Sequence, residues 1–136
     1  MPLVYRVMGK DVNDKPIIAA DAGLGVRHGS DVSVDGQGNA LRNHKGMSVF
    51  RAWREISLFR LPSRLIAGGR GDDKTYCFKM SEGPFVSGPI AEGLEFLAEN
   101  RSPSKHGVIR PDQIVPLATF RASLVATRDD WEIDEL

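Results

Sequence analysis

Short apolar runs with alternating polar positions recur along the chain and predict β-strands. The runs Leu3 to Met8, Tyr76 to Met80 and His106 to Ile109 are rich in β-branched and aromatic residues, a composition typical of strands. Residues 23–45 are instead rich in Gly, Asp, Asn and Ser, which predicts a set of loops around a short strand at 31–34. Because ordered strands flank this long segment, we interpret it as loops over a site rather than a linker.

A first helix is predicted roughly from Val49 to Ser57. Phe50, Trp53 and Ile56 recur there at helical spacing. Ser48 stands just before this stripe, at a tight turn, where a hydroxyl oxygen accepts from the first free backbone amides of a helix.

A second and clearer helix is predicted from Pro116 to about Asp130, since Pro116 suits a first helical turn. Its buried face should be formed by Leu117, Phe120, Leu124 and Trp131. Residues 94–97 fit either a strand or a short helix. Strands and helices do not alternate regularly, so the pattern predicts an α+β fold with a mainly antiparallel sheet.

Length and composition restrict the fold and its environment. The 136 residues suit a single domain, residues 1–136, that needs no disulfide or metal to fold. The one cysteine, Cys77, stands in a strand-like segment and is expected to be a buried, inert thiol. A single cysteine excludes an intramolecular disulfide framework and fits a reducing cytoplasm. The first residues do not have the pattern of a signal peptide, and no apolar run is long enough to span a bilayer.

The charge balance argues against several classes of partner. Eighteen basic and eighteen acidic residues cancel, whereas nucleic-acid binders usually carry a basic excess. The three histidines lack metal-ligand spacing, so no metal is expected. Five arginines nevertheless fall within twenty residues. They are either solvated side chains or a face that binds anions or a partner: Arg51, Arg54, Arg60, Arg64 and Arg70.

Three polar residues are the candidates for chemistry. Arg6 interrupts an apolar strand, where its guanidinium either faces solvent, pairs with a carboxylate, or binds an anion such as a dinucleotide phosphate. Ser48 either caps a helix or holds a ribose hydroxyl. His106 opens a late strand, either as a surface histidine or as a group that contacts a ribose hydroxyl or a diphosphate in a cleft.

These residues stand in three short motifs. Tyr5-Arg6 lies in the first strand, Gly46-Met47-Ser48-Val49-Phe50 in the middle, and His106 is followed by Ile109, Pro111, Phe120, Arg128, Trp131 and Glu132. In order and spacing the motifs resemble those of small type VI secretion effector toxins with an ADP-ribosyltransferase-like fold. The resemblance covers the first few residues, the middle and the last third of the chain.

The resemblance implies a mainly antiparallel split sheet with a few flanking helices, and NAD as the substrate. It implies that Arg6, Ser48 and His106 line one pocket and bind the dinucleotide, and that Ser48 and His106 act in catalysis. It further implies a toxin that acts in the cytoplasm of a target cell and is neutralised by a cognate immunity protein or antitoxin.

Two departures from the family pattern leave the reaction open. Met47 stands where the family has threonine, and the Glu-x-Glu pair of arginine-specific transferases is missing. Transfer of ADP-ribose to a target, cleavage or sequestration of NAD, and toxicity through another nucleotide-binding role therefore all remain open. The alternative is a non-enzymatic binding, adaptor or immunity protein that uses the arginine-rich face between Arg51 and Arg70.

Overall fold

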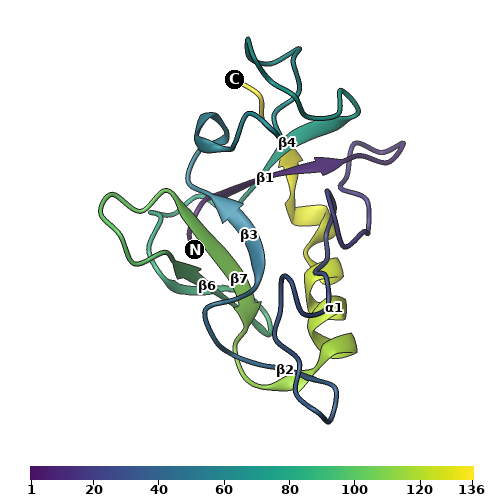
Figure 1. Ribbon diagram of the computed structural model, residues 1–136, viewed down its shortest axis with the longest axis vertical. Coiled ribbons are helices and arrows are strands. Elements are labelled where there is room, and N and C mark those ends of the chain that lie inside the picture. Colours follow the sequence, from purple (N-terminus) through teal and green to yellow (C-terminus); the bar gives the residue numbers. More distant parts are fainter.

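The chain folds into a curled, mostly antiparallel sheet with one α-helix, an α+β architecture (Figure 1). The computed structural model describes residues 1–136. The strands are β1 (Val4–Gly9), β2 (Asn39–Ala40), β3 (Met47–Phe50), β4 (Thr75–Met80), β5 (Gly88–Ala91), β6 (Leu94–Ala98), β7 (His106–Pro111), β8 (Val115–Pro116) and β9 (Glu132–Ile133). The helix is α1 (Leu117–Ala126), and the short 3-10 turns are η1 (Trp53–Glu55) and η2 (Arg128–Asp130). No helix is long and apolar enough to cross a membrane.

Seven strands form the main sheet in the order β5-β6-β7-β3-β1-β4-β9, and β2 pairs separately with β8. All pairings between these strands are antiparallel. The pairing of β1 with β4 extends over six residue pairs, whereas β1 and β3 share the single pair Tyr5 and Phe50. In Figure 1 the directions of β1 and β3 diverge strongly at this point. The sheet is therefore weakly joined at its centre.

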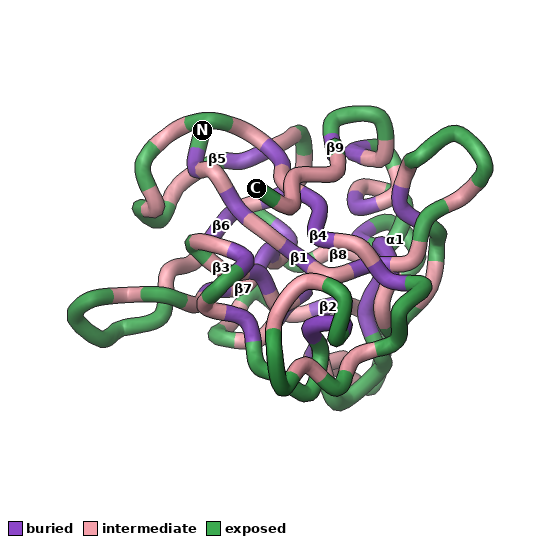
Figure 2. Tube along the Cα trace, turned by 90° about the horizontal axis from the view of Figure 1, so that it is seen from above, coloured by how far each residue is buried: buried purple, intermediate pink, exposed green.

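The side chains of a strand alternate between the two faces of the sheet, and each face packs against its own apolar cluster. Val4 and Met8 belong to the larger core, which also contains Phe120 and Leu124 of α1. Tyr5 and Val7 point to the other face and pack against a smaller cluster of Trp53, Ile56, Leu61 and Cys77. Figure 2 shows that the buried residues follow the strands and α1, while the exposed ones are concentrated in loops.

The predicted helix from Val49 to Ser57 is wrong. Residues Met47–Phe50 form strand β3, and only Trp53–Glu55 makes a helical turn. Met47 and Val49 are buried in the larger core, whereas Ser48 and Phe50 face the other way. Pairing with β7 over four residues fixes this extended backbone, because tertiary context overrides a local spacing of apolar residues. Ser48 is consequently a strand residue and not a helix cap.

The prediction of a late helix is confirmed in its main part. Helix α1 ends at Ala126, and η2 follows before the chain extends into β9. Phe120, Leu124 and Trp131 are fully buried, while Leu117 is partly buried. Trp131 reaches the core just after η2, not from within α1. Residues 94–97, which fitted either a strand or a helix, belong to β6.

Candidate functional site

The side chains of Ser48 and His106 form a hydrogen-bonded pair. Ser48 lies on β3 and His106 on the adjacent β7, where Phe50 is the direct partner of His106. Ser48 stands two residues from Phe50, so its side chain shares a face with that of His106. The Ser48 Oγ and His106 Nε2 atoms are 2.5 Å apart. Depending on the tautomer, Nε2 accepts the hydroxyl proton or donates to the hydroxyl oxygen.

Arg6 holds the place where β1 and β3 diverge. Its Nη1 donates to the backbone carbonyl of Ser48 at 2.8 Å, and its Nε donates to the carbonyl of Gly23 at 3.0 Å. The side chain is 6% exposed. These contacts give two backbone carbonyl groups a hydrogen-bond donor, and a buried polar group without a partner is costly. Arg6 thus joins the loop before Leu24, strand β1 and strand β3.

Arg6, Ser48 and His106 are linked by hydrogen bonds, but they lie on different faces of the sheet and so do not line one pocket as the resemblance implied. Arg6 alternates with Val4 and Met8 toward the larger core, whereas the Ser48 hydroxyl and His106 lie on the opposite face. Arg6 reaches Ser48 through its backbone, and Ser48 reaches His106 through its side chain. The three positions therefore form one connected chain of hydrogen bonds.

A cavity of about 280 Å³ lies beside His106. It runs along β6 and β7, and neither Arg6 nor Ser48 lines it. His106 therefore borders this cavity, with Ser48 behind it as a hydrogen-bond partner. The lining residues are His44, Leu97, Ala98, Glu99, Asn100, His106, Gly107 and Val108. Glu99 is an acidic group that the sequence patterns did not single out, because it precedes a loop and belongs to no recognisable motif.

The surroundings of His106 favour its neutral form. Burial lowers its pKa, the carboxylate of Glu99 acts in the opposite direction, and the positive charge of Arg60 lowers the pKa further. The ring also packs against Phe50, with the ring centroids 5.0 Å apart. A neutral histidine beside a cavity can accept a proton, so His106 has the properties of a general base.

Burial and the charge of Arg60 also act on Arg6. Burial lowers its pKa to about 10, and the charge of Arg60 acts in the same direction. Arg6 remains protonated at neutral pH, so its role as a double hydrogen-bond donor is maintained. The charge of Arg60 therefore lowers the pKa of both Arg6 and His106.

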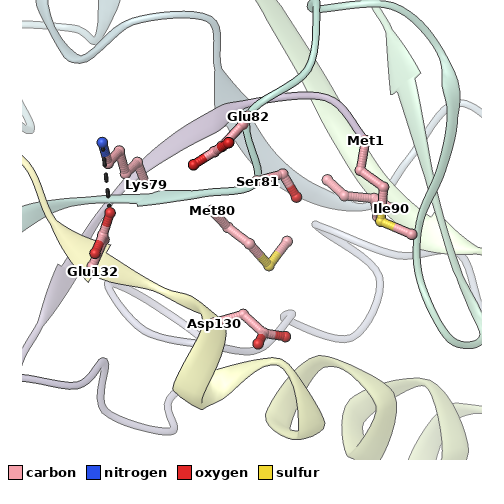
Figure 3. Close-up of a pocket in the computed structure, with 8 residues that line it drawn as sticks. All are labelled: Met1, Lys79, Met80, Ser81, Glu82, Ile90, Asp130 and Glu132. Atoms are coloured by element: carbon pink, nitrogen blue, oxygen red, sulfur yellow. Dashed lines mark ion pairs between the residues drawn. The ribbon is translucent and has the colours of Figure 1, made fainter.

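A larger cavity, of about 400 Å³, lies elsewhere in the molecule (Figure 3). Its polar groups include Lys79, Glu82, Asp130 and Glu132. Lys79 forms an ion pair with Glu132 at 3.6 Å, drawn as a dashed line in Figure 3. No histidine, cysteine or arginine lines this cavity, so it offers neither an imidazole nor a guanidinium. The Ser48 and His106 pair is the better candidate for chemistry.

No protein-family model, curated protein or solved structure matches this chain.

Proposed function

We propose that the protein is a bacterial toxin with an ADP-ribosyltransferase-like fold that binds and consumes NAD in the cytoplasm of a target cell. The observation that carries the proposal is the hydrogen bond between Ser48 Oγ and His106 Nε2 beside a cavity, next to the divergence of β1 and β3 that Arg6 holds. These are the three positions at which the sequence resembles the toxin family.

Cleavage of NAD breaks the bond between the nicotinamide nitrogen and the ribose carbon C1. Nicotinamide leaves with the electron pair of that bond, and the ribose develops oxocarbenium character. The oxygen of water, or a nucleophile of a target, then forms a new bond to C1 and releases a proton. The catalysis required is orientation of the substrate and stabilisation of the developing charge.

The residues at the site match these tasks. Neutral His106 can accept the proton from the attacking water, with Ser48 orienting its ring through the hydrogen bond to Nε2. The carboxylate of Glu99 lines the same cavity and is suited to stabilise a positively charged ribose. Arg6 contributes indirectly, because it fixes the backbone of Ser48 through the carbonyl group.

The test is release of nicotinamide from NAD by the purified protein, together with growth of cells that express it. Parent protein should release nicotinamide and arrest growth, while Ser48→Ala and His106→Ala variants should lose both effects at nearly unchanged melting temperature. An Asn43→Ala variant is the control, because Asn43 hydrogen-bonds Ser33 and lies outside this dyad. A folded parent that neither cleaves NAD nor arrests growth contradicts the proposal.

Neutralisation by a cognate immunity protein or antitoxin belongs to the same proposal. Such a partner would act by covering the cavity beside His106. Co-expression with a candidate partner should restore growth, and the complex should no longer release nicotinamide from NAD.

The alternative, a non-enzymatic adaptor that uses the arginine-rich face, gains little support from the contacts. Arg51 is paired with Glu55, and Arg64 with Glu135. Arg54 donates to the carbonyl of Leu136. Most of the five positive charges are therefore occupied within the molecule, and a silent expression phenotype would be the result that favours this alternative.

A further inference from the structure

A third cavity, of about 310 Å³, opens beside the place where Arg6 joins the strands. Val7 and Ala22 belong to its wall, and they are the chain neighbours of Arg6 and of Gly23, the two residues joined by a hydrogen bond. The rest of the wall comes from the adjoining loops and from the start of β4: Asp21, Arg27, Phe59, Arg60, Gly71, Asp72 and Thr75. The cavity is thus bordered by residues 21–27, by the loop that follows η1 and by the start of β4.

Arg60 is an exposed arginine of this wall whose guanidinium has no acceptor within the protein. The side chain makes no hydrogen bond or ion pair with another residue, in contrast to Arg27 of the same wall, which is paired with Asp31 at 3.1 Å. An arginine without an internal carboxylate can bind the oxygens of an external anion through its fork of N–H groups. The positive charge of Arg60 also contributes to lowering the pKa of His106.

Phe59 gives the same wall an exposed aromatic ring. Phe59 is 74% exposed, whereas Phe78 and Phe120 are fully buried. Such exposure is unusual for a phenylalanine. The guanidinium of Arg70, which also makes no hydrogen bond or ion pair, lies over the ring at 5.7 Å from its centroid. An exposed ring with an unpaired guanidinium over it is suited to stack on a nucleobase that carries phosphate.

Two carboxylates complete the wall, and they favour a ligand with hydroxyl groups over a simple anion. Asp21 and Asp72 line the cavity together with Arg60. Negative groups repel free phosphate, but a carboxylate accepts hydrogen bonds from the vicinal hydroxyls of a ribose, as in dinucleotide-binding folds. A base, a ribose and a phosphate together match this combination of ring, carboxylate and guanidinium.

We propose that this cavity binds the adenylate half of a dinucleotide, with the adenine on Phe59, the ribose hydroxyls toward Asp21 and Asp72, and the phosphate on Arg60. The inference rests on the proposed function, because it places the other half of NAD at the cavity beside His106. Arg60 lines only the first of these cavities, so it is a binding residue for the adenylate phosphate rather than a catalytic one.

Equilibrium binding of AMP to the full chain, measured by titration calorimetry, tests the inference. Phe59→Ala should weaken AMP binding roughly tenfold, the typical loss when one base loses its aromatic partner. Arg60→Gln should weaken AMP binding roughly tenfold as well, because a hydrogen bond to a charged group is removed, but should leave adenosine binding unchanged. Asp21→Asn should reduce the preference for AMP over 2′-deoxy-AMP.

Matched controls separate the binding residues from the loop that carries them. Leu58→Ala changes an exposed residue next to Phe59 in the chain, and Leu58 does not line the cavity. Arg42→Gln removes an exposed arginine that pairs with Glu95 elsewhere. Both controls should bind AMP as the parent does. Because Phe59 and Arg60 are exposed, their variants should melt at the parent temperature.

The outcomes distinguish this inference from the proposed function. AMP binding that depends on Phe59 and Arg60, in a protein that does not cleave NAD, supports the adenylate site and overturns the proposed reaction. NAD cleavage with AMP binding that is unchanged in Phe59→Ala and Arg60→Gln overturns the adenylate site alone. A parent protein that does not bind AMP overturns it as well.

Discussion

The indole N–H of Trp131 donates to the hydroxyl oxygen of Thr127 at 2.9 Å, with both side chains buried. The Thr127 hydroxyl in turn donates to the carbonyl of Leu124 at 2.7 Å. This short chain of hydrogen bonds ties the last turn of α1 to the residue that fills the core between η2 and β9. The indole N–H of Trp131 and the hydroxyl of Thr127 therefore both have hydrogen-bond partners inside an otherwise apolar cluster.

The first prediction concerns this link. Thr127→Val keeps the shape of the side chain but leaves a buried indole N–H without an acceptor, so the free energy of unfolding should fall by about 1–3 kcal/mol. Urea unfolding of Thr127→Val, Trp131→Phe and the double variant measures it. The double variant should lose less than the sum of the two single variants, and strict additivity would show that the bond contributes nothing.

The same core supports a second prediction. Phe120 and Trp131 are fully buried, so replacing either with alanine should lower the free energy of unfolding by about 3–5 kcal/mol. Thermal or urea unfolding provides the measurement. A loss below about 1 kcal/mol at both positions would show that α1 is peripheral to the fold.

The third prediction is that Arg6 stabilises the fold through its hydrogen bonds to two backbone carbonyl groups. Arg6→Met keeps much of the stem but leaves two carbonyl groups without their donor, so the free energy of unfolding should fall by about 1.5–3 kcal/mol. Arg6→Lys should rescue little, since one ammonium does not reproduce the two directions of the guanidinium fork. Parent-like stability of Arg6→Met would contradict the assigned role, and the surface variant Arg42→Gln is the control.

His106 predicts a specific dependence of stability on pH. Its pKa in the folded protein lies below the ordinary 6.5 because of burial and the charge of Arg60. As the pH falls through about 6.5, the unfolded chain takes up the proton before the folded chain does, and folding stability decreases until the pH passes the folded pKa. Stability from this group is therefore fully present above 6.5 and is lost below it.

His106→Gln should remove this portion of the pH dependence. The difference in unfolding free energy between parent and variant should change in favour of the variant as the pH falls below about 6.5. Urea unfolding across this range provides the measurement. If His106 also acts as the base in NAD cleavage, the parent reaction should already be at its maximum at neutral pH. If the unfolding free energies of parent and variant depend on pH in the same way, the pKa of His106 is not lowered by folding.

Cys77 should be chemically silent in the folded protein. The thiol is buried, and burial together with the nearby carboxylate of Glu135 raises its pKa to about 12, so the reactive thiolate is scarce. Iodoacetamide at mildly alkaline pH should label Cys77 only in denaturant. Rapid labelling under native conditions would contradict its position in the smaller cluster.

Much of the architecture follows from local pattern. The strands β1, β4 and β7 were predicted close to their observed positions because β-branched and aromatic residues are concentrated in them. The helix α1 was predicted from Leu117, Phe120 and Leu124, which recur at helical spacing. The inert environment of Cys77 was also expected from its strand-like neighbours. The α+β class follows from the irregular order of these elements.

Strand β3 was missed because its neighbours decide its structure. Phe50, Trp53 and Ile56 have helical spacing in the sequence, yet four residue pairs with β7 extend the first part of this segment. The same pairing places Ser48 beside His106, fifty-eight residues away in the sequence. A register between distant strands is a tertiary property, so no local pattern could reveal this contact.

The sequence by itself determined which residues carry unusual chemistry: an arginine within an apolar strand, a serine between apolar neighbours, and a histidine at the start of a late strand. Only the tertiary structure decided what each does. Alternation along β1 sends Arg6 into the larger core, where burial directs its guanidinium to carbonyl groups. Loop packing decides that Arg60 and Phe59 share a cavity wall. Strand alternation is local, but which face is covered, and by which loop, depends on the whole fold.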